Sequence, residues 1–309
     1  FEVPTSAELS INSVTIRNAV ADRGGSVISN QGTVQISGST FSGNRTVGTS
    51  LKGGAIYNDG TMTIQNTDFS GNYSIGASNH GAAIYSDGDL TIKALNSKTV
   101  SFSGNYVANS ESSAKTYEAI YMGAGKTLTL NVTNSGNIVF NDIINGDTGY
   151  NVAITGDTTS YVRFNNAVQN ANITLNTTEL VLGMGTDGGG NSIIANFGGS
   201  SFNAQSGKVN INDNQTLSYN LGKITASSNA LFAIDMKLAS SVISSDSIVA
   251  QSGSSGTIMI DSISGITIAA IMAAFDIETL IDHPIVVPVL YRNVASDNIK
   301  LALSTNITS

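Results

Sequence analysis

The chain has 309 residues and a formal net charge of −8, with 14 lysine and arginine residues against 22 aspartate and glutamate residues. This balance disfavours nucleic-acid binding, because contact with phosphates needs clustered cations. Cysteine is absent, which excludes disulfides, thiolate chemistry and cysteine-based metal sites. Apolar residues make up 40% of the chain, so there is enough apolar surface for a buried core and we do not expect disorder.

The sequence begins at Phe1 without an initiator methionine or a signal peptide, and it contains no apolar run of the length of a transmembrane helix. We therefore expect a processed or excised piece of a longer precursor.

Residues 1–24 begin with two short alternating segments around Leu9 and Val14, which predict two short strands. Three clear repeats follow. Each combines a glycine- or alanine-rich start before an isoleucine with a later Phe-Ser-Gly-Asn motif. The paired segments are 24–30 with 41–44, 53–58 with 69–72, and 81–86 with 102–105. The repeating isoleucines Ile28, Ile56 and Ile84 are spaced evenly, and a degraded fourth unit covers 119–140. We place the clear repeats between residues 24 and 120.

Each unit contains three short alternating segments and none with helical periodicity, so its strands must pair with those of the next unit. This predicts an all-β fold, a right-handed parallel β-helix with three short strands per coil. Equivalent residues would lie above one another, so that Ile56 stacks between Ile28 and Ile84, and Phe69 between Phe41 and Phe102.

Polar residues of the repeat have predicted structural roles. Asn44, Asn72 and Asn105 could form a hydrogen-bonded ladder at a corner of the coil, where asparagine also tolerates left-handed backbone. The glycine pairs, such as Gly53-Gly54, permit positive φ at the start of the next strand.

Downstream, alternation continues without the strict repeat, and we expect irregular coils over 121–235, with a loop over 186–191. We assign 1–235 to the β-helix and 236–309 to a C-terminal cap. In this cap, the spacing of Ile268, Ile271, Met272, Phe275 and Leu280 predicts a short helix over 268–281, and 284–291 and 299–303 predict closing strands.

The Gly-Gly-Ala-Ile motif at 53–56 and the Phe-x-x-Asn motif at 69–72 resemble the repeats of polymorphic outer-membrane proteins, a group of autotransporter adhesins. The segments 245–249, 253–258 and 284–290 are similar to the C-terminal part of autotransporter passenger domains, which helps to nucleate folding in that family. The resemblance implies a passenger at the surface of a Gram-negative bacterium or secreted from it, with an outer-membrane barrel C-terminal to this segment.

No catalytic or metal-binding residues are predicted, and no cofactor. Asp59 and Asp87 align in successive repeats, but each lies in a turn sequence where aspartate is common, and a shallow cation or ligand site is the minor alternative. His80 is predicted to be a solvated loop residue, and His283 precedes a proline at a strand entry. Neither histidine has the local signature of a catalytic triad.

Five tyrosines are the best candidates for binding. Tyr57, Tyr85 and Tyr121 each follow an inward isoleucine, so they should point outward on successive coils; we call them the first tyrosine column. Tyr73 and Tyr106 follow the corner asparagines and form the second tyrosine column. Tyrosine suits contacts with protein or sugar, although stacking that only stabilises the outer face is the alternative.

The leading hypothesis is a non-enzymatic autotransporter passenger that acts as an adhesin or a structural stalk. Its expected partners are a protein or glycan on a host cell or neighbouring cell, or other copies of itself, and not nucleic acid. Two alternatives remain. One is a polysaccharide-acting β-helix enzyme, which would need converging carboxylates such as Asp157, Glu179, Asp187 and Asp213. The other is a subunit of a surface layer or filament.

Overall fold

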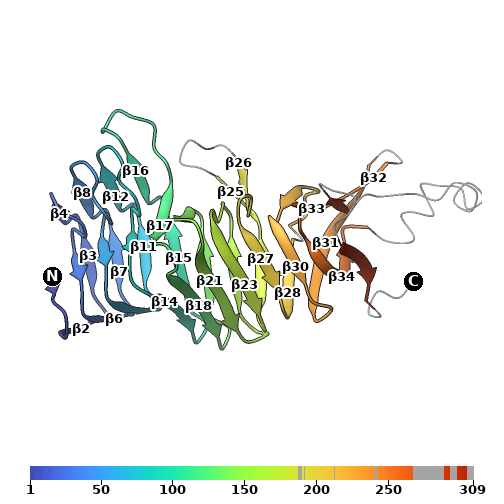
Figure 1. Ribbon diagram of the computed structural model, residues 1–309, viewed down its shortest axis with the longest axis horizontal. Coiled ribbons are helices and arrows are strands. Elements are labelled where there is room, and N and C mark those ends of the chain that lie inside the picture. Colours follow the sequence, from blue (N-terminus) through green and yellow to red (C-terminus); the bar gives the residue numbers. More distant parts are fainter. Residues whose placement is uncertain are drawn as a thin grey trace, which may run out of the picture.

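The computed structural model describes residues 1–186, 190, 192–211, 213–239, 242–266, 289–292 and 298–304. Within these residues all regular elements are strands, and nearly all strand pairs are parallel. The strands wind into coils that stack along one long axis (Figure 1), so the expected parallel β-helix is confirmed. None of the described residues belongs to a helix that could cross a membrane.

Most strands belong to three sheets. The six-stranded sheet contains β1 (Glu2–Val3), β5 (Ile28–Asn30), β9 (Ile56–Asn58), β13 (Ile84–Ser86), β17 (Glu118–Met122) and β20 (Ile143–Gly146). The four-stranded sheet contains β4 (Val20–Ala21), β8 (Arg45–Val47), β12 (Tyr73–Ile75) and β16 (Tyr106–Ala108).

The third sheet has 21 strands and follows the whole coil stack in two rows. The first row is β2 (Glu8–Asn12), β6 (Thr33–Ser37), β10 (Thr61–Gln65), β14 (Leu90–Leu95), β18 (Thr127–Thr133), β21 (Tyr150–Gly156), β23 (Ala171–Asn176), β27 (Ser201–Ala204), β30 (Lys223–Ala226), β34 (Ser255–Ser264) and β36 (Asn298–Leu303). The second row is β3 (Thr15–Arg17), β7 (Thr40–Ser42), β11 (Asp68–Ser70), β15 (Thr99–Ser103), β19 (Asn137–Phe140), β22 (Tyr161–Phe164), β24 (Glu179–Leu182), β28 (Gly207–Asn210) and β31 (Ala230–Ala239), with β32 (Val242–Ser245) antiparallel to β31.

Each clear repeat therefore contributes four strands to three sheets, where the sequence predicted three strands. The additional strand arises because the large sheet takes two strands from each coil, separated by a bend. Gly38 and Asn66 occupy this bend in successive coils with φ of 54° and 48°, the left-handed region in which glycine and asparagine are tolerated.

The predicted core columns are confirmed. Ile56 pairs in register with Ile28 and Ile84, and Phe69 pairs with Phe41 and Phe102, and all six side chains are fully buried. The phenylalanine rings lie nearly parallel, with centroids 5.1 Å apart between Phe41 and Phe69 and 4.9 Å apart between Phe69 and Phe102. The spacing of equivalent residues along the sequence thus becomes stacking along the axis of the coils.

The predicted asparagine ladder is present and completely buried. The side-chain amide of Asn44 donates to Asn72 Oδ1 at 3.0 Å, and that of Asn72 donates to Asn105 Oδ1 at 2.9 Å. The amide of Asn105 in turn donates to Asp142 Oδ2 at 2.8 Å, so the fourth unit ends the ladder with a carboxylate. The prediction of left-handed asparagines is wrong, because the preceding residue of each motif, such as Gly71 with φ of 60°, takes that conformation.

A second buried ladder was not predicted. Asn30 donates through its side-chain amide to Asn58 Oδ1 at 2.7 Å, and Asn58 donates to Ser86 Oγ at 2.8 Å. All three side chains are fully buried. They follow the outward residues of β5, β9 and β13, so they point back into the coil beside the isoleucine column.

The irregular coils predicted over 121–235 are also parallel and in register. Leu128 pairs with Val152, Val152 with Ile173 and Ile173 with Phe202. An antiparallel hairpin of β25 (Met184–Thr186) and β26 (Ser192–Ile194) projects from the stack where the loop over 186–191 was expected. Residues 187–189 and 191 of that loop lie outside the described residues.

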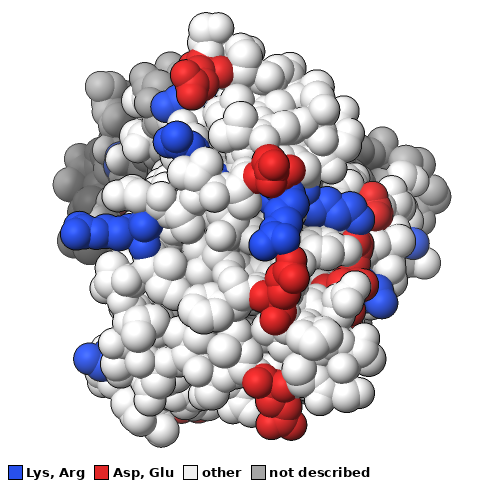
Figure 2. Space-filling model, turned by 90° about the vertical axis from the view of Figure 1, so that its left-hand side faces the viewer, with Lys and Arg blue, Asp and Glu red and all other residues white. Residues whose placement is uncertain are grey.

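Beyond residue 235 the stack continues through β34 and β36. A further sheet begins at β29 (Ser218–Asn220) and continues through β33 (Ser247–Ala250) and β35 (Leu290–Arg292). The predicted helix over 268–281 and the first part of the strand over 284–291 lie outside the described residues. Viewed from the N-terminal end of the stack, much of the surface is uncharged, and the few charged side chains lie singly or in small groups (Figure 2).

Candidate binding surface: two tyrosine columns

The first tyrosine column lies on the outer side of the six-stranded sheet. Tyr57, Tyr85 and Tyr121 follow the buried residues Ile56, Ile84 and Ile120 on β9, β13 and β17, and they pair in register. Their ring centroids are 6.1 Å and 5.0 Å apart along the column. The outward direction was predicted, but Tyr85 is only 7% exposed, because neighbouring side chains cover its ring.

Lys52 is one of the residues that cover this column. Its ammonium nitrogen lies 4.6 Å from the ring centroid of Tyr85 and 5.7 Å from that of Tyr57, which are cation–π contacts. The same nitrogen forms an ion pair with Asp87 Oδ2 at 2.6 Å. Burial opposes the charged form of Lys52, but the hydrogen bond to Asp87 and the nearby tyrosines leave its pKa raised above the ordinary value.

Asp87 thus does more than shape its turn. Its carboxylate accepts the ion-pair hydrogen bond from Lys52 and a longer one, 3.3 Å, from the Tyr57 hydroxyl. At the other end of the column, the Tyr121 hydroxyl donates to Asp147 Oδ1 at 2.8 Å. The first column is therefore bonded to carboxylates of the chain itself, and Asp87 is occupied by a lysine.

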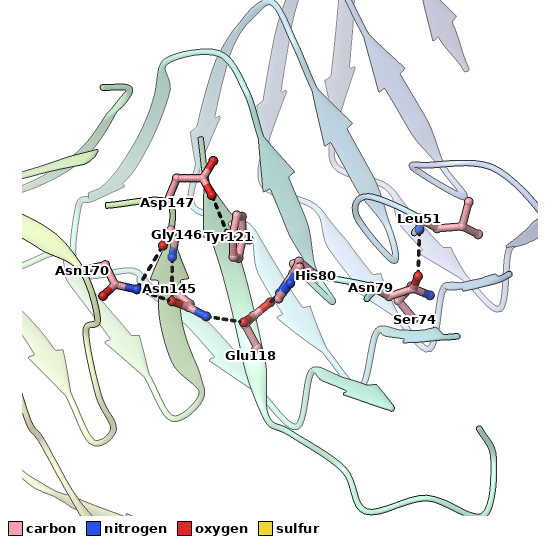
Figure 3. A network of polar contacts seen from close by, with 11 residues as sticks. Leu51, Ser74, Asn79, His80, Glu118, Tyr121, Asn145, Gly146, Asp147 and Asn170 are labelled. Carbon is pink, nitrogen blue, oxygen red and sulfur yellow. Dashed lines mark hydrogen bonds and ion pairs between the residues drawn. The ribbon is translucent and has the colours of Figure 1, made fainter. Parts of the chain in front are cut away.

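His80 is not the freely solvated residue that the sequence predicted. Its ring packs on that of Tyr121 at a tilt of 35° with centroids 4.3 Å apart, and its Nδ1 lies 3.3 Å from Glu118 Oε1 (Figure 3). The hydrogen bond with Glu118 raises the pKa of His80, burial opposes this, and the charges of Glu118 and Asp147 add to it. Lys52 and His80 form a parallel bridge, so they occupy equivalent positions in successive coils.

Glu118 is the buried centre of a polar network. Its side chain is 3% exposed, and Oε1 also accepts a hydrogen bond from the backbone of Gly81 at 2.7 Å. Its Oε2 accepts from the side-chain amide of Asn145 at 2.9 Å, and Asn145 Oδ1 accepts from Asn170 at 3.3 Å (Figure 3). The network ties together several coils beneath the first tyrosine column, and its hydrogen bonds stabilise a buried carboxylate.

Glu118 was not among the predicted site residues, although the sequence contains a signal for it. The register of β13 and β17 places Glu118 next to Ala82, and the backbone of Ala82 donates to Glu118 O at 3.1 Å. A small residue thus becomes a carboxylate in the next coil. Such a charge within a column of small residues indicates a bonded, buried acid and could have been found by aligning the repeats.

The second tyrosine column lies on the four-stranded sheet. Tyr73 of β12 and Tyr106 of β16 pair in register, and their rings are nearly parallel with centroids 5.0 Å apart. Arg45 lies in register with Tyr73 on the preceding coil and donates through Nη1 to the Tyr73 hydroxyl at 2.7 Å. Lys115 places its ammonium 4.2 Å from the ring centroid of Tyr106. Neither cation was predicted as part of a site.

The carboxylates required by the enzyme alternative have separate partners where they are described. Asp157 accepts from Asn134 and Thr159, Glu179 accepts from Asn210, and Asp213 accepts from Tyr219. Among the described residues, no group of three or more histidine and acidic side chains could hold a metal ion. Asp187 and His283 lie outside the described residues.

Comparison with known proteins adds no relative: no family model, no curated protein and no solved structure matches this chain.

Proposed function

We propose that this chain is a non-enzymatic module that acts as an adhesin or a structural stalk. It would lie at the surface of a Gram-negative bacterium or be secreted from it, as autotransporter passengers are. The glycine–isoleucine and Phe-x-x-Asn repeats support this proposal, since their resemblance to adhesin repeats includes the residues that form the coils. The two tyrosine columns, which lie on two different sheets of the same successive coils, are the observation that carries the adhesive role. Tyrosine edges and hydroxyls in a line suit contact with an extended protein or glycan.

The stalk role follows from the same geometry. A stack of parallel coils is elongated and presents broad faces, so that an interaction region can be held away from a cell surface. Identical copies could also meet along such faces, since extended contact area favours association. Proteins or glycans of host cells or neighbouring cells remain the proposed partners, with self-association beside them.

Adhesion can be tested with the purified chain coupled to fluorescent beads. Beads that carry the wild-type chain should bind to cultured epithelial cells or to one another, and a Tyr57→Ser/Tyr121→Ser/Tyr106→Ser variant should bind several-fold less. Tyr161→Ser is a matched control, because Tyr161 lies on β22 of the large sheet, outside both columns. Equal binding of all three bead types would contradict the role of the columns.

Two further experiments test the alternatives of a polysaccharide-acting enzyme and a filament subunit. Release of new reducing ends or unsaturated sugars from acidic or neutral polysaccharides at an ordinary enzymatic rate would overturn the non-enzymatic proposal. A mass measurement in dilute solution would separate a monomeric or weakly associating module from a stable filament subunit.

A further inference from the structure

The second tyrosine column is enclosed by two cations. Arg45 CZ lies 5.7 Å from the ring centroid of Tyr73, and Lys115 Nζ lies 4.2 Å from that of Tyr106. Because Tyr73 and Tyr106 stack on each other with an interplanar angle of 4°, the cations must take the two outer ring faces. The ring edges, the hydroxyls and the positive charges are what this row offers to a ligand.

These cations are not neutralised by the chain. In the described part of the protein, neither Arg45 nor Lys115 lies within ion-pair distance of a carboxylate, whereas Lys52 beside the first column is paired with Asp87. Arg45 donates through Nη1 to the Tyr73 hydroxyl, and its Nε is buried without a partner among the described residues, so the donors open to a ligand are the other N–H groups of Nη1 and Nη2. Unused donors beside aromatic edges indicate a site for an anionic group.

One acidic side chain acts on this row from a distance. Glu111 is exposed in the segment between β16 and β17. Its negative charge interacts electrostatically with Arg45 and Tyr106, although Glu111 forms no ion pair with Arg45. It would repel an anion, so its removal offers a test in the opposite direction from removal of the cations.

We propose that the row formed by Arg45, Tyr73, Tyr106 and Lys115 binds an acidic polysaccharide through the carboxylate or sulfate groups of its sugars. The guanidinium and the ammonium donate charge-assisted hydrogen bonds to the anionic oxygens, and the tyrosine edges and hydroxyls contact the sugar rings. This inference rests on the proposed function and deepens it, because it assigns a ligand class to one of the two columns.

The shape of the row favours a linear chain of sugars over other anionic partners. The four side chains follow one another along the coil axis in a single file, which suits an extended polymer. A membrane surface calls for a cluster of about four to eight basic residues. Nucleic acid likewise calls for several phosphate contacts. Two cations are few for either partner, while tyrosine contacts supply the rest of the binding energy for a sugar chain.

Binding of the full chain to dextran sulfate, polygalacturonate and neutral dextran tests the proposal. We expect binding to at least one acidic polymer and none to neutral dextran, and the polymer bound separates sulfate from carboxylate recognition. Arg45→Gln and Lys115→Gln should each weaken binding about tenfold, as expected for loss of a charge-assisted contact. Glu111→Gln should strengthen it, and added salt should weaken it.

Lys93→Gln is the matched control, because it makes the same charge change on β14 of the large sheet and should alter binding less than twofold. Circular dichroism verifies that each variant is folded. The proposal is overturned if neither acidic polymer binds, if Lys93→Gln weakens binding as much as Arg45→Gln, or if polyglutamate binds as tightly as the polysaccharides. Bead adhesion that survives in Arg45→Gln/Lys115→Gln but is lost in Tyr57→Ser/Tyr121→Ser would leave the adhesive function standing and remove this ligand assignment.

Discussion

The coils before Asp142 and those after it achieve the same fold with different means. Before Asp142, buried amides form ladders, and the first three isoleucines of the column, Ile28, Ile56 and Ile84, are evenly spaced along the sequence. After it, the six- and four-stranded sheets have ended at β20 and β16, and register partners such as Leu128 with Val152 and Ile173 with Phe202 are unevenly spaced. Inward apolar columns continue throughout. The columns therefore suffice for parallel coils, while the ladders join equivalent corners of successive coils even where the coil length changes.

The aromatic stack offers the largest expected contrast between the two regions. Phe102 lies between Phe69 and Phe140, with centroids 4.9 Å and 4.7 Å away and nearly parallel rings. Among the described residues, Phe202 contacts one aromatic ring, that of Phe197, which it approaches edge-on with centroids 5.5 Å apart. Phe102→Ala should lower the free energy of unfolding by about 4–5 kcal/mol and Phe202→Ala by about 3 kcal/mol, since stacked pairs add to the cavity cost.

Urea denaturation monitored by circular dichroism measures both losses of unfolding free energy. The two variants can be compared if the slope of unfolding free energy against urea concentration is the same as in the wild-type chain. Equal losses for Phe102→Ala and Phe202→Ala would mean that ring stacking adds nothing to the regular coils beyond burial.

Loss of the asparagine ladder of Asn44, Asn72 and Asn105 should have the next largest effect on stability. The Asn72 amide donates to Phe41 O and Asn105 Oδ1, and its Oδ1 accepts from the backbone and side chain of Asn44. Asn72→Ala leaves these buried partners without hydrogen bonds, so it should lower the free energy of unfolding by about 3–4 kcal/mol. Asn203→Ala, on a partly exposed position of β27, should cost less than about 0.5 kcal/mol. A small effect of Asn72→Ala in thermal and urea unfolding would show that the ladder is dispensable.

The later coils contain a pair of buried carboxylates that lie close to each other. Asp235 and Asp246 are almost inaccessible to solvent, and Asp246 accepts backbone hydrogen bonds from Leu217 and Asp235. Burial raises the pKa of Asp246 to about 7; the hydrogen bonds oppose this, and the charges of Asp235 and Asp213 add to it. The folded chain therefore holds a proton on Asp246 at pH values where the unfolded chain has released it.

This proton makes the later coils sensitive to pH. Protonation of Asp246 contributes about 4 kcal/mol of stability, which is fully present below about pH 4, the unfolded pKa, and is lost as the pH rises to about 7. Asp246→Asn should remove this dependence, so the difference in unfolding free energy between the wild-type chain and the variant should change between pH 4 and pH 7. A constant difference over that range would contradict the prediction.

The sequence was most informative where one residue type recurs. Ile28, Ile56 and Ile84, with Phe41, Phe69 and Phe102, identified the columns and their register, because stacking converts sequence period directly into contact. It was less informative about the surface. Tyr85 was predicted to point outward, but the sequence does not show that the loop with Lys52 folds back over its ring.

Glu118 and Lys115 were also not predicted, because their contacts do not follow from the repeat. Glu118 was not predicted because the degraded fourth unit is recognisable by Ala119, Ile120 and Tyr121, and Glu118 directly precedes this motif at the position equivalent to Ala82. Lys115 reaches Tyr106 only because the chain after β16 turns back, with Val107 and Thr116 forming an antiparallel bridge. Contacts made by irregular segments have no period to reveal them.

His80 and Glu118 give the smallest predicted effect and place a second pH dependence in the regular coils. The pKa of His80 is raised, chiefly by the hydrogen bond with Glu118, so protonated His80 stabilises the folded chain. This contribution is complete below the unfolded pKa of about 6.5 and is lost as the pH rises through the higher folded value. This contribution should stay below about 1 kcal/mol, because His80 is half-exposed and solvent screens the pair.

Urea unfolding of the wild-type chain and of His80→Gln tests this prediction. The wild-type chain should exceed His80→Gln in unfolding free energy by more at pH 5.5 than at pH 8.5. In the Glu118→Gln background this difference should no longer depend on pH. If His80→Gln costs the same at both pH values, ring stacking on Tyr121, and not the charge of His80, is what stabilises this end of the first tyrosine column.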